Sequence, residues 1–216
     1  MNNPLQIKGP VLVLAPHPDD EIGCAALLTR LCREGYDVHY YYFSTCRQST
    51  EALGKPAEQL LEENRSSLRM IGIPEENCHG FDFPVRYFPE HRQAILEALV
   101  KLRQDLRPGL LLVPNSYDIH QDHATISSEA VRAFKHSSIL GYELPWNTLE
   151  FKNDCLVPIS QEELDTKLGA LECYASQESR IYANRRFFES LANIRGVQAG
   201  VENAECFEVI RLMLSN

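Results

Sequence analysis

Two apolar runs, VLVLA (residues 11–15) and LLLVP (residues 110–114), constrain the fold more than any other feature of the chain. A strand with one face in water alternates apolar and polar residues, whereas these runs are apolar throughout. Strands of that kind are typical of parallel sheets that helices cover on both faces. The sequence therefore predicts an α/β protein in which both runs are buried strands.

The segments around these runs predict an alternation of strands and helices. Further strands are expected at residues 37–44, 79–83, 139–144, 155–159 and 206–214, and helices at residues 20–33, 57–72, 90–106, 124–135, 161–174 and 182–191. Strands that alternate with helices form βαβ units and hence a parallel sheet. We predict a mainly parallel sheet with helices on both faces, in a single domain over residues 1–216.

Charge and cysteine usage restrict the partners and the compartment. The formal net charge of −9 argues against nucleic acid or an anionic membrane surface, because both select basic proteins. No membrane span is expected, since no apolar stretch approaches about 18 residues. No signal peptide is expected, since MNNPLQIKGP at the start of the sequence lacks a basic stretch and a long apolar run. Seven scattered cysteines without a C-x-x-C pair fit a reducing cytoplasm. A homo-oligomer is compatible with the sequence, which does not specify the number of subunits.

A polar cluster follows each of the two apolar runs. PHPDDE (residues 16–21) comes after the first, and DIHQDH (residues 118–123) comes after the second. Each has a structural explanation alone, because acidic residues favour helix N-termini and polar loops connect strands to helices. In open parallel sheets, however, ligands bind beyond the carboxyl ends of the strands. Two such clusters at one edge favour a functional site.

The side chains of these clusters are the types that bind metal ions. A catalytic zinc usually takes three histidine or carboxylate ligands, lowers the pKa of a bound water to about 7, and leaves a position open. A second carboxylate can then accept the proton of the water, and a histidine can stabilise the oxyanion on an attacked carbonyl. Two histidines with one carboxylate also suit iron(II). The residue types alone do not say which aspartate binds the metal.

Taken together, the two clusters resemble the motifs of a known family. PHPDDE, followed much later by HQDH (residues 120–123), is similar to the paired motifs of the PIG-L/LmbE-like zinc-dependent de-N-acetylases. EENRSSLRMIGI (residues 62–73) and AECFEV (residues 204–209) also resemble a helix and the C-terminal strand of that family. The resemblance implies a Rossmann-like α/β fold with a metal at the carboxyl edge of the sheet. It also implies hydrolysis of the acetyl group from N-acetylglucosamine-type conjugates.

The resemblance also assigns roles, position by position. It implies that His17, Asp20 and His123 are the zinc ligands. It further implies that Asp19 is the general base and that His120 polarises the carbonyl group or stabilises its oxygen.

The remaining candidates carry weaker indications. The family often has proline where this chain has Gln121, a change that leaves the metal-competent atoms in place. Arg47 stands where the family places a substrate-binding arginine, although a solvated loop arginine explains it equally well. Asp82 is a candidate for the cleft lining. We expect Asp122 to orient a neighbouring metal ligand or to cap a helix. We expect Glu21 to lie at a helix N-terminus, where negative charge is favourable.

The predicted function is zinc-dependent removal of an N-acetyl group from a small amino-sugar conjugate. The alternative is a zinc-dependent hydratase or amidase of the same fold, acting on a small carboxylate or conjugate. A basic pocket around Arg47 would favour the hydratase. A module that only binds metal or sugar is less favoured, because binding does not need a general base. Trp146, the only tryptophan, could stack on a sugar ring or fill the core.

Overall fold

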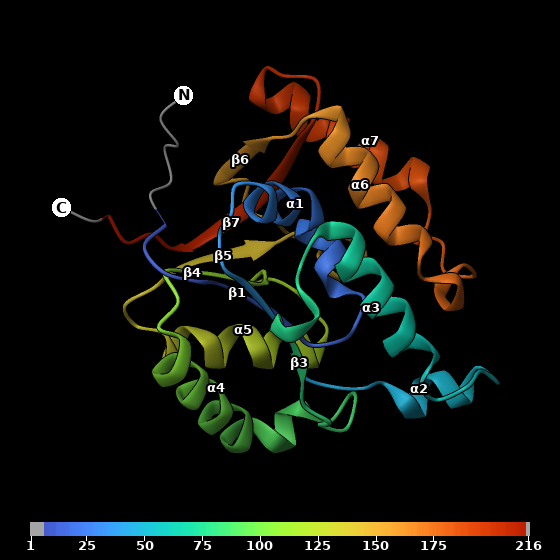
Figure 1. The fold of residues 1–216 in the computed structure, drawn as a ribbon, viewed down its shortest axis with the longest axis vertical. Helices are drawn as coiled ribbons and strands as arrows, with labels where there is room; N and C mark the ends of the chain where they lie inside the picture. Colours follow the sequence, from blue (N-terminus) through green and yellow to red (C-terminus); the bar gives the residue numbers. More distant parts are fainter. Residues whose placement is uncertain (1–6, 215–216) are drawn as a thin grey trace.

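The computed structural model describes residues 7–214 and is built on a central seven-stranded sheet (Figure 1). The strand order is β3-β2-β1-β4-β5-β7-β6. The strands are β1 (Val11–Ala15), β2 (Val38–Tyr42), β3 (Cys78–Gly80), β4 (Leu110–Pro114), β5 (Ser138–Tyr142), β6 (Cys155–Pro158) and β7 (Ala204–Arg211). β3, β2, β1, β4 and β5 are parallel, whereas β7 runs antiparallel to β5 and β6. The predicted mainly parallel sheet is confirmed.

Helices cover both faces of the sheet, as predicted (Figure 1). α1, α3, α6 and α7 lie on one side, and α4 and α5 lie on the other. The helices are α1 (Ala25–Arg33), α2 (Arg47–Ala52), α3 (Gln59–Ile71), α4 (Arg92–Leu106), α5 (Gln121–Ala133), α6 (Gln161–Glu172) and α7 (Arg185–Ala199). No helix within residues 7–214 has the length and apolar character needed to cross a membrane.

The continuous apolar character of β1 follows from its position between two cores. Val11, Val13 and Ala15 belong to the core under α1, α3 and α6, whereas Leu12 and Leu14 belong to the core under α4 and α5. All five side chains have no exposed surface. Because both faces are covered, neither face of the strand tolerates the polar residues of an alternating pattern.

Several helix boundaries differ from the sequence prediction, and one helix is absent from it. The helix expected over residues 20–33 begins as a 3-10 turn, Asp20–Cys24, before α1. The helix expected over residues 182–191 begins at Arg185 and continues to Ala199, because the Asn184 side chain accepts a hydrogen bond from the Phe187 N–H and caps its start. The short α2 has too few turns to show a helical period and was not predicted.

A carboxylate from β7 fixes the start of α1. Glu205 accepts hydrogen bonds from the N–H groups of Ala26 (3.0 Å) and Leu27 (2.8 Å), and it pairs with the buried Lys167 of α6 at 2.7 Å. The resemblance of AECFEV to a family strand therefore coincides with a structural role. α1 follows directly on the PHPDDE segment, so this contact also helps to hold that segment in place.

Replacing Glu205 by alanine is expected to lower the free energy of unfolding by about 3–5 kcal/mol, because it leaves the Lys167 ammonium buried without a partner. Urea denaturation of the variant and the wild type would measure the difference. Glu202→Ala, at an exposed position on the neighbouring turn, is the control and should change stability by less than about 0.5 kcal/mol. A Glu205→Ala variant as stable as the control would contradict the assignment.

Candidate metal centre

The two polar clusters meet at the carboxyl edge of β1 and β4. The chain leaves β1 for β2 on one side, and β4 lies on the other side of β1, so the strand order reverses here. This is where open α/β sheets bind ligands.

α5 begins at Gln121, three residues before the predicted start at Ala124, because the His120 side chain caps it: Nδ1 accepts the Asp122 N–H at 3.2 Å. His123 therefore lies on the first turn of a helix.

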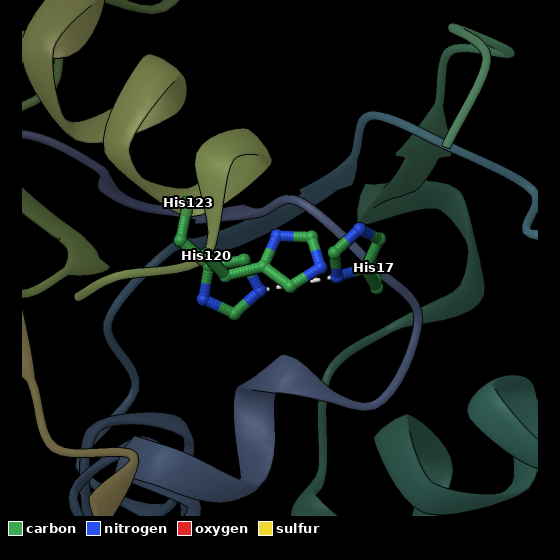
Figure 2. A group of neighbouring side chains, drawn as sticks. All are labelled: His17, His120 and His123. Carbon is green, nitrogen blue, oxygen red and sulfur yellow. Dashed lines mark hydrogen bonds between the residues drawn. The ribbon is translucent and has the colours of Figure 1, made fainter. Parts of the chain in front are cut away.

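Three side-chain atoms form a compact group at this edge. His17 Nδ1 lies 3.1 Å from His123 Nε2, and Asp20 Oδ2 lies 3.4 Å from each of them. Figure 2 shows the His17 and His123 rings turned toward each other. The backbone N–H of His17 holds the Asp20 carboxylate in place by donating a hydrogen bond to Oδ2 at 2.7 Å. The arrangement thus brings together one atom from each of three residues, two from PHPDDE and one from the first turn of α5.

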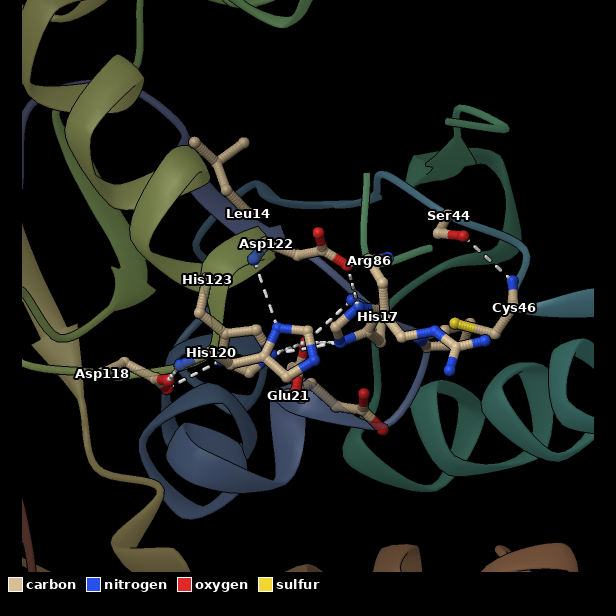
Figure 3. A network of polar contacts seen from close by, with 12 residues as sticks. Leu14, His17, Glu21, Ser44, Cys46, Arg86, Asp118, His120, Asp122 and His123 are labelled. Atoms are coloured by element: carbon tan, nitrogen blue, oxygen red, sulfur yellow. Dashed lines mark hydrogen bonds and ion pairs between the residues drawn. The ribbon is translucent and has the colours of Figure 1, made fainter. Parts of the chain in front are cut away.

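A second carboxylate lies behind each of the two imidazoles. Asp122 Oδ2 is 3.0 Å from His17 Nε2, and Asp118 Oδ2 is 2.7 Å from His123 Nδ1 (Figure 3). Both carboxylates are buried. Each can accept a hydrogen bond from the protonated ring nitrogen that faces it, which leaves His17 Nδ1 and His123 Nε2 as the unprotonated inner nitrogens. The inner nitrogens then turn their lone pairs toward each other and toward Asp20. A cation between these atoms would stabilise such an arrangement.

The spacing of these donors fits a tetrahedral metal ion. Ligands about 2.0–2.1 Å from a tetrahedral zinc lie about 3.3–3.4 Å apart, close to the separations observed between His17, Asp20 and His123. A three-histidine group is the other possibility, since nitrogen atoms of His17, His120 and His123 lie within 4.8 Å of one another. In that case His120 would have to bind through Nε2, because Nδ1 already accepts the Asp122 N–H.

Two further members of the clusters, Asp19 and His120, have environments suited to proton transfer and hydrogen bonding. Burial and the adjacent Asp20 raise the pKa of Asp19 to about 6, so its carboxylate is ionised but basic near pH 7. Burial and the neighbouring His123 lower the pKa of His120 to about 4, which keeps its ring neutral. Because Nδ1 of His120 is an acceptor, the proton resides on Nε2, where it can be donated.

Glu21 lies behind the site rather than in it. Its carboxyl group is fully buried and accepts hydrogen bonds from the hydroxyls of Ser67 (2.6 Å) and Tyr174. Burial raises its pKa to about 8. Asn64 also donates to the Pro18 carbonyl oxygen, so α3 contacts the PHPDDE segment at two points. These contacts hold the loop, a more specific role than the acidic helix terminus expected from the sequence.

The predicted ligands open onto a cavity of about 410 Å³, a size typical of small-molecule sites. The described residues that line it include His17, Asp19, Asp20, Cys46, Arg86, His120, His123, Trp146, Asn147, Gln177, Arg180 and Tyr182. Trp146 and Tyr182 stack with their ring centroids 4.0 Å apart and their planes 6° from parallel. Trp146 therefore belongs to the cavity wall and also packs against the core.

The two predicted substrate contacts have partners within the protein. Arg47, the first residue of α2, is exposed and pairs with Glu58 at 2.8 Å. Asp82 is exposed and accepts a hydrogen bond from the Thr45 hydroxyl at 2.5 Å. Neither is among the described residues that line the cavity. Sequence reasoning included Asp118 in the DIHQDH cluster without giving it a role. It missed Arg86 and Arg180, because nothing in the sequence relates these two positions to the histidines.

Comparison with known proteins adds to this geometry. The family model described as PIG-L, GlcNAc-PI de-N-acetylase, matches residues 12–134. The chain is 27% identical to an uncharacterized deacetylase, YaiS, of Escherichia coli, over 77% of this chain and 90% of that protein. It is 30% identical to the diacetylchitobiose deacetylase of Thermococcus kodakarensis, over 66% of this chain and 51% of that protein.

Solved structures share the fold. The N,N'-diacetylchitobiose deacetylase of Pyrococcus horikoshii superposes with a TM-score of 0.77 at 21% identity, covering 95% of this chain and 84% of that one. The 4-carboxy-2-hydroxymuconate hydratase of Pseudomonas putida gives a TM-score of 0.77 at 18% identity, covering 97% and 99%. At these identities the likeness establishes the α/β architecture alone, since one fold hosts different reactions.

Proposed function

Because the chain belongs to the PIG-L family and is a deacetylase, we propose that it hydrolyses the N-acetyl group of an N-acetylglucosamine-type conjugate. The products would be acetate and a free amino sugar. The observation that carries this proposal is the triangle of His17, Asp20 and His123 donors, which opens onto a cavity that Asp19 and His120 also line. The substrate would be a small molecule of the size that the cavity accommodates.

In this proposal His17, Asp20 and His123 hold a zinc ion, and iron(II) is compatible with the same donors. Bound there, the metal would supply Lewis-acid chemistry and a more acidic water. Asp122 and Asp118 would keep the two imidazoles in the orientation and tautomer that ligation requires. The separations between the donors support this set over the three histidines, because they match the edges of a tetrahedron.

The remaining steps belong to Asp19 and His120. Asp19 would accept a proton from the attacking water and then deliver it to the departing nitrogen as the amide C–N bond breaks. His120 would donate its Nε2 proton as a hydrogen bond to the carbonyl oxygen as negative charge develops there.

The alternative activity, a hydratase on this fold, receives no comparable support. The family model and both relatives in sequence carry deacetylase names, whereas the hydratase shares the fold at 18% identity. Arg47, the predicted centre of a basic pocket, is exposed and pairs with Glu58. A cytoplasmic location remains a prediction.

Acetate release by the zinc-loaded protein tests the proposal. The panel would be N-acetylglucosaminyl conjugates of inositol, malate, a nucleoside diphosphate, a lipid and a second sugar. We expect acetate and a primary amine to appear in equal amounts from at least one member, and chelation of the metal to stop the reaction. If metal content is confirmed and no member releases acetate, the proposed activity is wrong.

A further inference from the structure

Two arginines line the cavity without a carboxylate partner. Arg86 lies between β3 and α4, and Arg180 lies between α6 and α7. Within residues 7–214, neither guanidinium forms an ion pair, although many other arginines of this acidic protein do. Asp19 and Asp20, both from PHPDDE, are the acidic residues among the described lining. Both arginines are exposed, so their guanidinium groups are accessible to a molecule bound in the cavity.

The position of Arg86 is set by the site itself. Its N–H donates to Asp122 Oδ2 at 2.6 Å, the same atom that lies 3.0 Å from His17 Nε2. Its carbonyl oxygen accepts the Gln121 side-chain amide at 3.3 Å, a contact that a proline at position 121 could not make. The departure from the family motif at this residue therefore holds Arg86 in place. Figure 3 shows the Arg86 side chain extending past His17 toward Cys46.

The backbone of Arg86 is in an uncommon conformation, with φ at +71°. Glycine and asparagine adopt this left-handed region most easily, and a long side chain rarely does. Local strain of this kind persists where the surroundings fix it, commonly at ligand sites. The Arg86 side chain is exposed and lines the cavity, so its guanidinium can bind a group from outside the chain.

Arg180 belongs to a segment that the aromatic pair anchors. Tyr182, two residues further on, stacks on Trp146, and both rings line the same cavity as Arg180. Gln177, on the other side of Arg180 in sequence, is buried and also lines the cavity. The guanidinium therefore extends from a segment that is held at both ends against the cavity.

We propose that Arg86 and Arg180 bind an anionic group, a phosphate or a carboxylate, on the part of the conjugate beyond the amino sugar. This inference rests on the proposed deacetylation. A guanidinium presents paired N–H donors that match the oxygens of either anion, and it remains charged at any physiological pH. The two arginines would select charged conjugates from neutral ones without taking part in bond breaking.

The sole tryptophan makes binding measurable apart from turnover, because Trp146 lines the cavity. Its fluorescence would be titrated with deacetylated ligands: glucosamine 1-phosphate, a glucosaminide with a carboxylate on its aglycone, and neutral methyl glucosaminide. We expect at least one anionic ligand to bind about 10-fold more tightly than the neutral one. Comparison of the two anionic ligands identifies which anion the arginines prefer.

Arg86→Gln and Arg180→Gln should each reduce that preference, and the double variant should abolish it, with less than about 2-fold change for methyl glucosaminide. Unchanged binding of the neutral ligand also shows that the variants are folded. Arg69→Gln, which removes the same charge from an exposed position of α3, should retain the full preference. A double variant that still prefers the anionic ligands, or a wild type without any preference, would overturn the inference.

The same variants separate this inference from the proposed function. Wild-type protein that releases acetate equally well from neutral and anionic conjugates, with no effect of the arginine variants, retains the deacetylase activity and loses the inference. Absence of acetate from every conjugate contradicts the deacetylase proposal, while the fluorescence titration still decides whether the arginines recognise anions.

Discussion

Replacing Asp19 by asparagine is expected to lower kcat for acetate release by about 10²- to 10⁴-fold while the protein keeps its metal. Asparagine has the size of aspartate but cannot accept the proton of the attacking water. Asp19 lines the cavity, and His17, Asp20 and His123 form the compact donor triangle without it. Turnover and metal content should therefore separate in this variant.

Acetate release and zinc content would be measured on the same preparation. Asp105→Asn, at an exposed position of α4, is the matched control and should retain both. Two results would contradict the role of Asp19. An Asp19→Asn variant with more than about a tenth of the wild-type kcat has another general base. A variant that also loses its metal shows that Asp19, rather than Asp20, is a ligand.

The location of the site could be predicted because it depends on short stretches of sequence. The apolar runs 11–15 and 110–114 indicated two buried parallel strands, and the polar clusters that follow them had to meet at one edge of the sheet. The predicted start of α5 lies three residues too late. His120 is not a usual capping residue, yet its ring nitrogen accepts the Asp122 N–H and caps the helix. The sequence therefore predicts a loop over DIHQDH, whereas α5 begins within this cluster at Gln121.

Contacts between distant parts of the chain were beyond the sequence. Asp118 precedes His123 by five residues in a polar stretch, where an aspartate normally indicates a turn, so its contact with His123 Nδ1 could not be anticipated. Arg86 and Arg180 stand in segments without a recognisable motif, and only the folded chain brings them to one cavity. Residues that bind the variable part of a ligand lie on such segments, because loops change more easily than the scaffold that holds the metal.

The two possible ligand sets make opposite predictions for His120 and Asp20. If His17, Asp20 and His123 bind the metal, His123→Ala and Asp20→Ala should weaken zinc affinity by more than about 100-fold, beyond the effect of losing an orienting contact. His120→Ala should then change affinity by less than about 10-fold and lower kcat by about 10²- to 10³-fold, because it removes the donor to the carbonyl oxygen. Zinc retained against a series of competing chelators measures the affinities.

The distances support the first set, since Asp20 Oδ2 lies 3.4 Å from both His17 Nδ1 and His123 Nε2, close to the edges of a tetrahedron around zinc. Nδ1 of His120 accepts the Asp122 N–H, so only Nε2 is available, either to the metal or to a substrate oxygen. His136→Ala, at an exposed position after α5, is the control for loss of an imidazole. If His120→Ala loses zinc and Asp20→Ala retains it, the three histidines hold the metal, and Asp20 becomes available as a second proton acceptor beside Asp19.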